Sequence, residues 1–327
     1  MNATDFILLH VAMICLSMGS VQCFLHREPA FEQINPHKHP HSTFMSEASS
    51  AEVPNRLNSL FRTLYIPKLK HEDEPQNTWN SQVHQDALVA YLLGCKRNGY
   101  FVDLAANDAI TISNTFALER FLNWNGICWE ANPHYWYRLA TKRSCVVIGG
   151  AATGSTGEEV EFVFGGGLGG IQTTEEYQTD VTFETLQRNF KKNHGRIGTY
   201  GKPGEAPEQE KVPTSTLNEV LELFAPERID YLSLDVEGAE WIVMQNFNFT
   251  KHRFAIMTIE RPKEQLMNLL HQYGYQEHPQ RVSMNRFRET LWIAEDFPNR
   301  QEILATPMHV LIEKALKNTP LDCKSSL

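Results

Sequence analysis

Tyr100-Phe101-Val102-Asp103-Leu104 is an apolar run with one acid, and the small and polar residues 105–109 follow it. A continuous apolar run of this length is typical of a strand that is buried on both faces. A second such run, Ile229 to Asp235, contains Asp230 and ends on Asp235. Strands buried on both faces occur in parallel sheets covered by helices, so the two runs predict an α/β protein.

Strand-like and helix-like segments alternate outward from these runs. Strands are expected at 100–104, 126–130, 145–148, 159–164, 229–235, 254–260, 275–284 and 289–293, and helices at 82–93, 113–122, 133–140, 183–192, 217–224, 240–247 and 264–273. This alternation predicts a doubly wound, mainly parallel sheet. The strand at 159–164 is expected to lie outside it, and the last two strands predict a terminal antiparallel hairpin.

Residues 165–211 are rich in glycine and then charged, and they are too many for an ordinary loop. Gly165 to Gly170 matches the dinucleotide pattern G-x-G-x-x-G after a strand. The acid expected about 20 residues later is missing, because Gln187 to Phe190 stands there. The segment is therefore predicted to be an insertion, or a lid over the site, with a helix at 183–192.

Composition excludes several other classes of protein. The 327 residues are 42% hydrophobic and 21% charged, which is typical of a globular protein. The net charge of −9 disfavours nucleic-acid partners. The six cysteines include no C-x-x-C pair, which argues against a zinc ribbon, and their pairing stays open.

The two ends of the chain differ from residues 79–298. Residues 1–23 contain most of the apolar run Phe6 to Leu25, which predicts a signal peptide, although Asp5 and the lack of Lys or Arg before it fit poorly. An uncleaved membrane anchor is the alternative, and only then is a membrane a partner. Residues 24–78 are predicted to be a flexible linker and 299–327 a C-terminal extension. The expected location is the secretory pathway or outside the cell, with a plastid address as an alternative.

Acids follow several of the predicted strands. Ligands of doubly wound sheets bind at the carboxyl ends of the strands. Glu130 ends the second strand, 21 residues after Ala109, where an acid that accepts the ribose hydroxyls is expected. Asp235 and Glu260 end two later strands. These acids, without a phosphate-binding lysine, predict an adenosine-type ligand that has no polyphosphate.

Several motifs, in this order, resemble FkbM-type methyltransferases over about residues 80–297. They are Ser81-Gln82 with Gln85-Asp86, Tyr100 to Asp108, Ser113-Asn114-Thr115 with Leu118-Glu119, Trp124 to Pro133, and Asp230 to Glu240. The resemblance implies a Rossmann-like class I fold with a seven-stranded sheet. It also implies S-adenosylmethionine as the cofactor and O-methylation as the reaction.

The same resemblance assigns residues to the cofactor. They are Asp103, Ala105, Asn107, Ser113, Asn114 and Glu130. The turn after the first strand would lie under the methionine part, Glu130 would hold the ribose hydroxyls, and Ser113 and Asn114 would line or cap the cofactor side.

The chain departs from the usual glycines of this turn, because it has Ala105 and Ala109. Alanine in a left-handed conformation costs about 1–2 kcal/mol. Asn107 and Asp108 tolerate that conformation and are expected to make the turn. The departure raises a question about cofactor affinity rather than about the fold.

Asp235 and Glu237 are the predicted catalytic residues. They lie two positions apart, so they would face opposite sides if the strand continued. Asp235 is expected near the reacting groups, or alternatively as an N-cap for the next helix. No metal ligand is assigned. A divalent cation held by Asp235 and Glu260 is the alternative to a loop acid that pairs with Arg261.

Two functions follow from the sequence. The first is an O-methyltransferase that acts on a hydroxyl of a small molecule, glycan or lipid. The second is a catalytically silent protein that uses the same fold for binding or trafficking. Cofactor binding separates the two, and the oligomeric state stays open.

Overall fold

The computed structural model describes residues 63–65, 77–165, 169–192, 207–282 and 288–323. The predicted signal or anchor segment and most of the predicted linker lie outside these residues. Within the described part, every helix is too short or too polar to span a bilayer.

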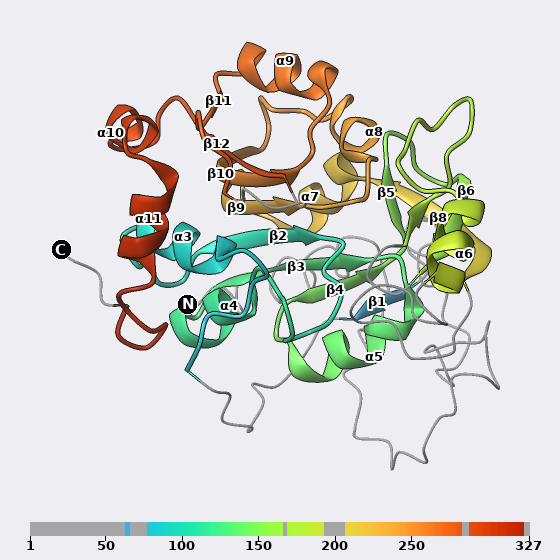
Figure 1. The fold of residues 1–327 in the computed structure, drawn as a ribbon, viewed down its shortest axis with the longest axis horizontal. Helices are drawn as coiled ribbons and strands as arrows, with labels where there is room; N and C mark the ends of the chain where they lie inside the picture. Colours follow the sequence, from blue (N-terminus) through green and yellow to red (C-terminus); the bar gives the residue numbers. More distant parts are fainter. Residues whose placement is uncertain (1–62, 66–76, 166–168, 193–206, 283–287, 324–327) are drawn as a thin grey trace, which may run out of the picture.

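The main sheet is mixed, with a parallel centre (Figure 1). In spatial order its eight strands are β1 (Thr63–Tyr65), β4 (Val146–Gly149), β3 (Asn125–Glu130), β2 (Tyr100–Leu104), β9 (Arg228–Leu234), β10 (Arg253–Glu260), β12 (Glu289–Ile293) and β11 (Gln276–Glu277). The neighbours from β4 to β10 are parallel. Strands β12 and β11 are antiparallel, which confirms the predicted hairpin.

Two details of this sheet differ from the prediction. Strand β1 pairs antiparallel with β4 and makes an eighth strand from a segment predicted to be linker. Strand β11 is much shorter than the predicted 275–284: it spans Gln276–Glu277, although the N–H of His278 still donates to the carbonyl of Leu291 on β12, and residues 283–284 lie outside the described part. Short edge strands carry too few residues for a periodic signal.

Helices cover both faces of the sheet. They are α3 (Gln85–Leu92), α4 (Phe116–Leu122), α5 (Pro133–Lys142), α7 (Leu217–Phe224), α8 (Glu240–Met244), α9 (Glu264–Gln272), α10 (Arg300–Ala305) and α11 (Met308–Ala315). Successive strand residues face opposite sides, so Phe101 packs in one apolar cluster and Val102 in the other. Burial on both faces explains why these strands read as continuous apolar runs.

A second sheet lies beside the carboxyl ends of the first (Figure 1). Its order is β5 (Ala151–Thr153), β8 (Glu208–Thr216), β6 (Glu159–Phe164) and β7 (Gly170–Ile171), and α6 (Phe183–Lys192) follows β7. The predicted outlying strand and the predicted helix of the insertion are confirmed as β6 and α6. The sequence did not predict β8, because most of its residues are polar and it contains Pro213.

The C-terminal extension packs against the start of the domain. Helix α11 lies against α3, as Figure 1 shows. A disulfide joins Cys95, just after α3, to Cys323. Trp79 Nε1 donates a hydrogen bond of 2.8 Å to the carbonyl of Asn318. The extension is therefore covalently and non-covalently fixed to the sheet domain.

Candidate functional site

A pocket opens where the carboxyl ends of β2, β3 and β9 meet the second sheet. Its wall includes Ala105, Asn107, Glu130, Asp235, Glu237 and Gly170. The chain continues from β2 to β3 and β4 on one side and to β9 and β10 on the other. The pocket therefore lies at the topological switch point, where open α/β sheets bind their ligands.

The insertion forms one wall of this pocket. Gly169, Gly170 and Ile171 line it. A Cβ placed on Gly170 would lie 3.3 Å from Cβ of Glu237, so the two backbones pass close together. The N–H of Asp180 also donates to the carbonyl of Glu237 at 3.2 Å. The predicted position of the insertion beside the site agrees with these contacts, while residues 166–168 lie outside the described part.

The turn after β2 contains two left-handed residues. Ala105 has φ 62° and Asn107 has φ 53°, whereas Asp108 and Ala109 are outside the left-handed region. The backbone N–H groups of Ala105 and Ala106 both donate to the carbonyl of Trp129, at 2.9 and 3.1 Å. The turn therefore has the backbone conformation that glycine favours. Ala105 adopts this conformation at a cost in conformational free energy.

Glu130 holds the ends of β2 and β3 together. Its Oε2 accepts from the N–H of Asn107 at 2.8 Å, and its Oε1 accepts from the N–H of Asn132 at 2.7 Å. The side chain is buried, and burial raises the pKa of Glu130 to about 7. Each carboxylate oxygen has a second lone pair for another donor.

Three of the residues predicted to contact the cofactor lie behind the pocket wall. Asp103 accepts from Thr115 Oγ1 at 2.6 Å. Ser113 Oγ accepts from the N–H of Phe116, the first residue of α4, at 3.1 Å, although the N-cap position itself belongs to Thr115. Asn114 Nδ2 donates to Ser233 Oγ at 2.9 Å. The structure therefore places these side chains where they support the turn.

Arg143 organises this supporting layer, and sequence reasoning did not identify it. The fully buried guanidinium donates through Nε to Glu119 at 3.0 Å, through Nη1 to Ser113 at 3.2 Å and through Nη2 to Thr115 at 2.8 Å. Burial is a tertiary property, so no local pattern distinguishes this arginine from an exposed one.

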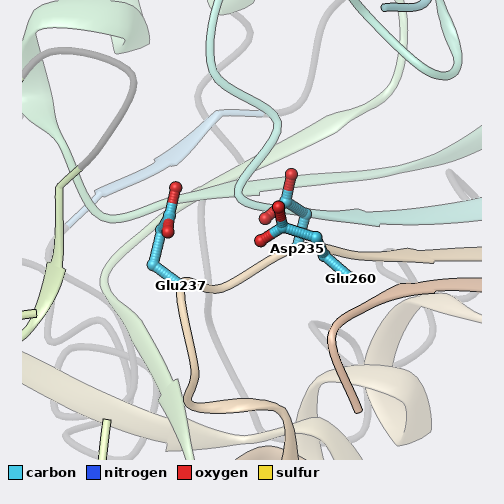
Figure 2. A group of neighbouring side chains, drawn as sticks. All are labelled: Asp235, Glu237 and Glu260. Carbon is cyan, nitrogen blue, oxygen red and sulfur yellow. The ribbon is translucent and has the colours of Figure 1, made fainter. Parts of the chain in front are cut away.

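Three carboxyl groups meet at the far side of the pocket. One oxygen from each of Asp235, Glu237 and Glu260 lies within 4.8 Å of the others. Figure 2 shows Asp235 and Glu260 close together, with Glu237 beside them on the loop after β9. Strand β9 ends at Leu234 and Glu237 has φ 52°, so Asp235 and Glu237 both line the pocket instead of facing opposite sides.

Asp235 does not cap the next helix. Helix α8 begins at Glu240 after Ala239, without a side-chain cap. Glu240 Oε1 instead accepts from the N–H groups of Val236 and Gly238, at 3.3 and 3.1 Å. The alternative interpretation of Asp235 as an N-cap is therefore wrong.

Arg261 contacts two members of the cluster. Its Nη2 donates to Glu260 Oε2 at 2.6 Å and to Glu237 Oε2 at 2.8 Å. Arg261 has φ 45°, a left-handed conformation. Burial and the neighbouring charge of Glu260 raise the pKa of Asp235 well above its usual range. The cluster is therefore a buried acidic site whose negative charge is partly compensated by Arg261.

The comparisons with known proteins fit this arrangement. A family model described as the methyltransferase FkbM domain matches residues 103–277. The chain belongs to this family. The matched region begins at Asp103, on the strand that leads into the pocket turn, and it includes Glu130, Asp235, Glu237 and Glu260. Comparisons with curated proteins and with solved structures found no match.

Proposed function

We propose that the protein is an S-adenosylmethionine-dependent methyltransferase with a Rossmann-like class I fold. Its acceptor would be a hydroxyl of a small molecule, glycan or lipid. The observation that carries the proposal is the placement of Glu130, a buried acid at the end of β3, in a pocket at the switch point of the sheet. Membership of the FkbM methyltransferase family supports the same reaction.

The residues of the pocket fit this cofactor. Two ribose hydroxyls are donors, and the carboxylate of Glu130, whose lone pairs are only partly used by backbone N–H groups, can accept from them. The left-handed Ala105 and Asn107 bring the backbone of the turn to the pocket wall. The described pocket wall contains no lysine for a polyphosphate. The binding site therefore suits a nucleoside that carries no phosphate chain.

Methyl transfer asks little covalent chemistry of the protein. When bound, S-adenosylmethionine supplies an electrophilic methyl group. The chain must place the acceptor oxygen in line with it and remove the hydroxyl proton. Asp235 and Glu237 line the pocket with carboxyl groups that face the same space. We assign them the positioning of the hydroxyl and the acceptance of its proton.

One observation keeps a second function in view. Ala105 adopts the left-handed conformation at the cofactor turn, where its Cβ makes the backbone strained. A catalytically silent member that uses the fold for binding or trafficking would tolerate a weakened cofactor turn. Cofactor binding decides between the two functions.

Calorimetric titration of the purified protein with S-adenosylmethionine tests the proposal. We expect micromolar affinity in the wild type, a large loss in Glu130→Gln, and no change in Glu159→Gln, which removes an exposed acid on β6. Failure of the folded wild type to bind would contradict the enzyme and favour the silent protein.

We further propose that the protein passes through the secretory pathway. The Cys95–Cys323 disulfide is typical of oxidising compartments. Asn248 of the sequon Asn248-Phe249-Thr250 is exposed, so its side chain is accessible for a glycan. When the protein is expressed in secreting eukaryotic cells, we expect its electrophoretic band to shift on glycosidase treatment. Thr250→Ala should abolish the shift, and Thr250→Ser, which keeps the sequon, should retain it. A wild type without a shift would contradict this proposal.

A further inference from the structure

The acidic cluster is open to the pocket on one side and buried on the other. Asp235 and Glu237 line the pocket, and Glu260, which is 6% exposed, closes the back. Their candidate ligand atoms lie within 4.8 Å of one another. Oxygen ligands of one hard cation sit about 2.0–2.6 Å from it, so ligands on opposite sides are about 4–5 Å apart. The three groups can therefore bind a single ion together.

Glu289 is an independent sign that positive charge is needed here. It lies directly opposite Glu260 in the antiparallel β10–β12 pair, so the two side chains project from the same face of the sheet. Glu289 is 2% exposed, and its Oε1 has no hydrogen-bond partner among the described residues. An unpartnered buried carboxylate oxygen is unfavourable unless a proton or a cation compensates for it.

A second buried acid, Glu240, also indicates that positive charge is needed here. Its Oε1 fixes the loop of Asp235 and Glu237 through two backbone N–H groups. Its Oε2 is buried and has no hydrogen-bond partner in the part of the chain that the structure describes. The loop that carries two members of the cluster therefore rests on another carboxyl group.

Arg261 compensates for part of this charge only. Its guanidinium carries one positive charge, and its Nη2 contacts Oε2 of both Glu237 and Glu260. These contacts use Oε2 of each side chain, so the two Oε1 atoms and the carboxyl group of Asp235, which contacts Glu260, can face a second cation. Arg261 and an ion can therefore occupy opposite sides of the same carboxylates.

We propose that Asp235, Glu237 and Glu260 bind one hard divalent cation, Mg²⁺ or Mn²⁺, at the wall of the pocket. The donor atoms are all carboxylate oxygens, which these ions prefer over softer metals. An octahedral ion with three carboxylate ligands keeps positions for other oxygens. Here the inference rests on the proposed function: those positions would orient an acceptor that carries two neighbouring oxygens, such as a vicinal diol.

Mn²⁺ binding to the metal-free full-length protein, without S-adenosylmethionine, tests the site. The signal of free Mn²⁺ in electron paramagnetic resonance measures the bound fraction. We expect one ion per chain, displaced by Mg²⁺, and at least a tenfold loss of affinity in Asp235→Asn and Glu260→Gln. Glu302→Gln, which removes an exposed acid on α10, should bind as the wild type does.

Two further variants keep the test decisive. If a variant fails to fold by thermal melting, Glu237→Gln, at a less buried position, replaces it. Arg261→Gln should retain or tighten Mn²⁺ binding, because it removes a neighbouring positive charge that repels the ion. Absence of binding by the wild type at millimolar Mn²⁺, or equal affinities in the cluster variants and Glu302→Gln, would overturn the site.

Calorimetry with S-adenosylmethionine on the same samples separates this inference from the proposed function. Mn²⁺ binding without cofactor binding would support the metal site and contradict the methyltransferase. Cofactor binding without Mn²⁺ binding would contradict the metal site alone.

Discussion

The backbone N–H of Asn107 donates a 2.8 Å hydrogen bond to Oε2 of Glu130. The contact joins the turn after β2 to the end of β3, so the acid that we assign to the ribose also shapes the turn that we assign to the methionine part. A change at either position is therefore expected to act on both parts of the cofactor site.

Cofactor binding should depend on pH through Glu130. Burial raises its pKa to about 7, so the carboxyl group is largely protonated at pH 5. Hydroxyl donors favour the ionised form, and binding below pH 7 must first remove the proton. Between pH 7 and pH 5 we expect the Kd for S-adenosylmethionine to rise by about fiftyfold, since the carboxyl group is about half ionised at its pKa and only about 1% ionised two pH units below it. Calorimetry over this range measures it, with Glu130→Gln as a pH-independent control. An equally steep profile in that variant would contradict the assignment.

Ala105→Gly should stabilise the fold. The left-handed φ of 62° costs alanine about 1–2 kcal/mol, a cost that glycine avoids. Glycine loses about 0.5–1 kcal/mol more backbone entropy on folding, which offsets part of this stabilisation. We expect the free energy of unfolding in urea to rise by about 1 kcal/mol or less. Ala106→Gly, at a buried neighbour outside the left-handed region, should lower it. Destabilisation by both substitutions would show that the turn relieves its strain in another way.

Loss of Arg143 should be strongly destabilising. Arg143→Met leaves Glu119 buried without its cation and removes donors from Ser113 and Thr115. Breaking a buried pair of this kind costs about 3–5 kcal/mol. Arg138→Met breaks the exposed pair with Asp108 and should cost about 1 kcal/mol or less. Denaturant unfolding of both variants gives the comparison, and similar small losses would contradict a structural role for the Arg143 contacts.

The Cys95–Cys323 disulfide should stabilise the attachment of the C-terminal extension. The two residues are 228 positions apart, so the bond restricts a long loop of the unfolded chain. Replacing both cysteines with serine should lower the free energy of unfolding by roughly 2–4 kcal/mol. Thermal melting with and without reductant checks this value: reductant should destabilise the wild type and leave the double variant unchanged.

The sequence by itself determined the order of the main strands and helices along the chain. The apolar run Tyr100–Leu104 becomes β2 with unchanged bounds, and residues 183–192 become α6 with unchanged bounds. These signals are local, because periodicity and turn residues act within a few positions of the chain. The family resemblance, carried by motifs at the strand ends, is likewise confirmed over 103–277.

The tertiary structure decided which of the predicted residues meet. Glu260 and Glu289 come from separate segments, and only the pairing of β10 with β12 places them opposite each other. The buried contacts of Arg143 and the disulfide also join residues that are distant in sequence. Polar segments such as β8 are strands only because neighbouring strands, here β5 and β6, pair with them. Such contacts depend on how the sheets assemble, and for that reason no local pattern in the chain could specify them.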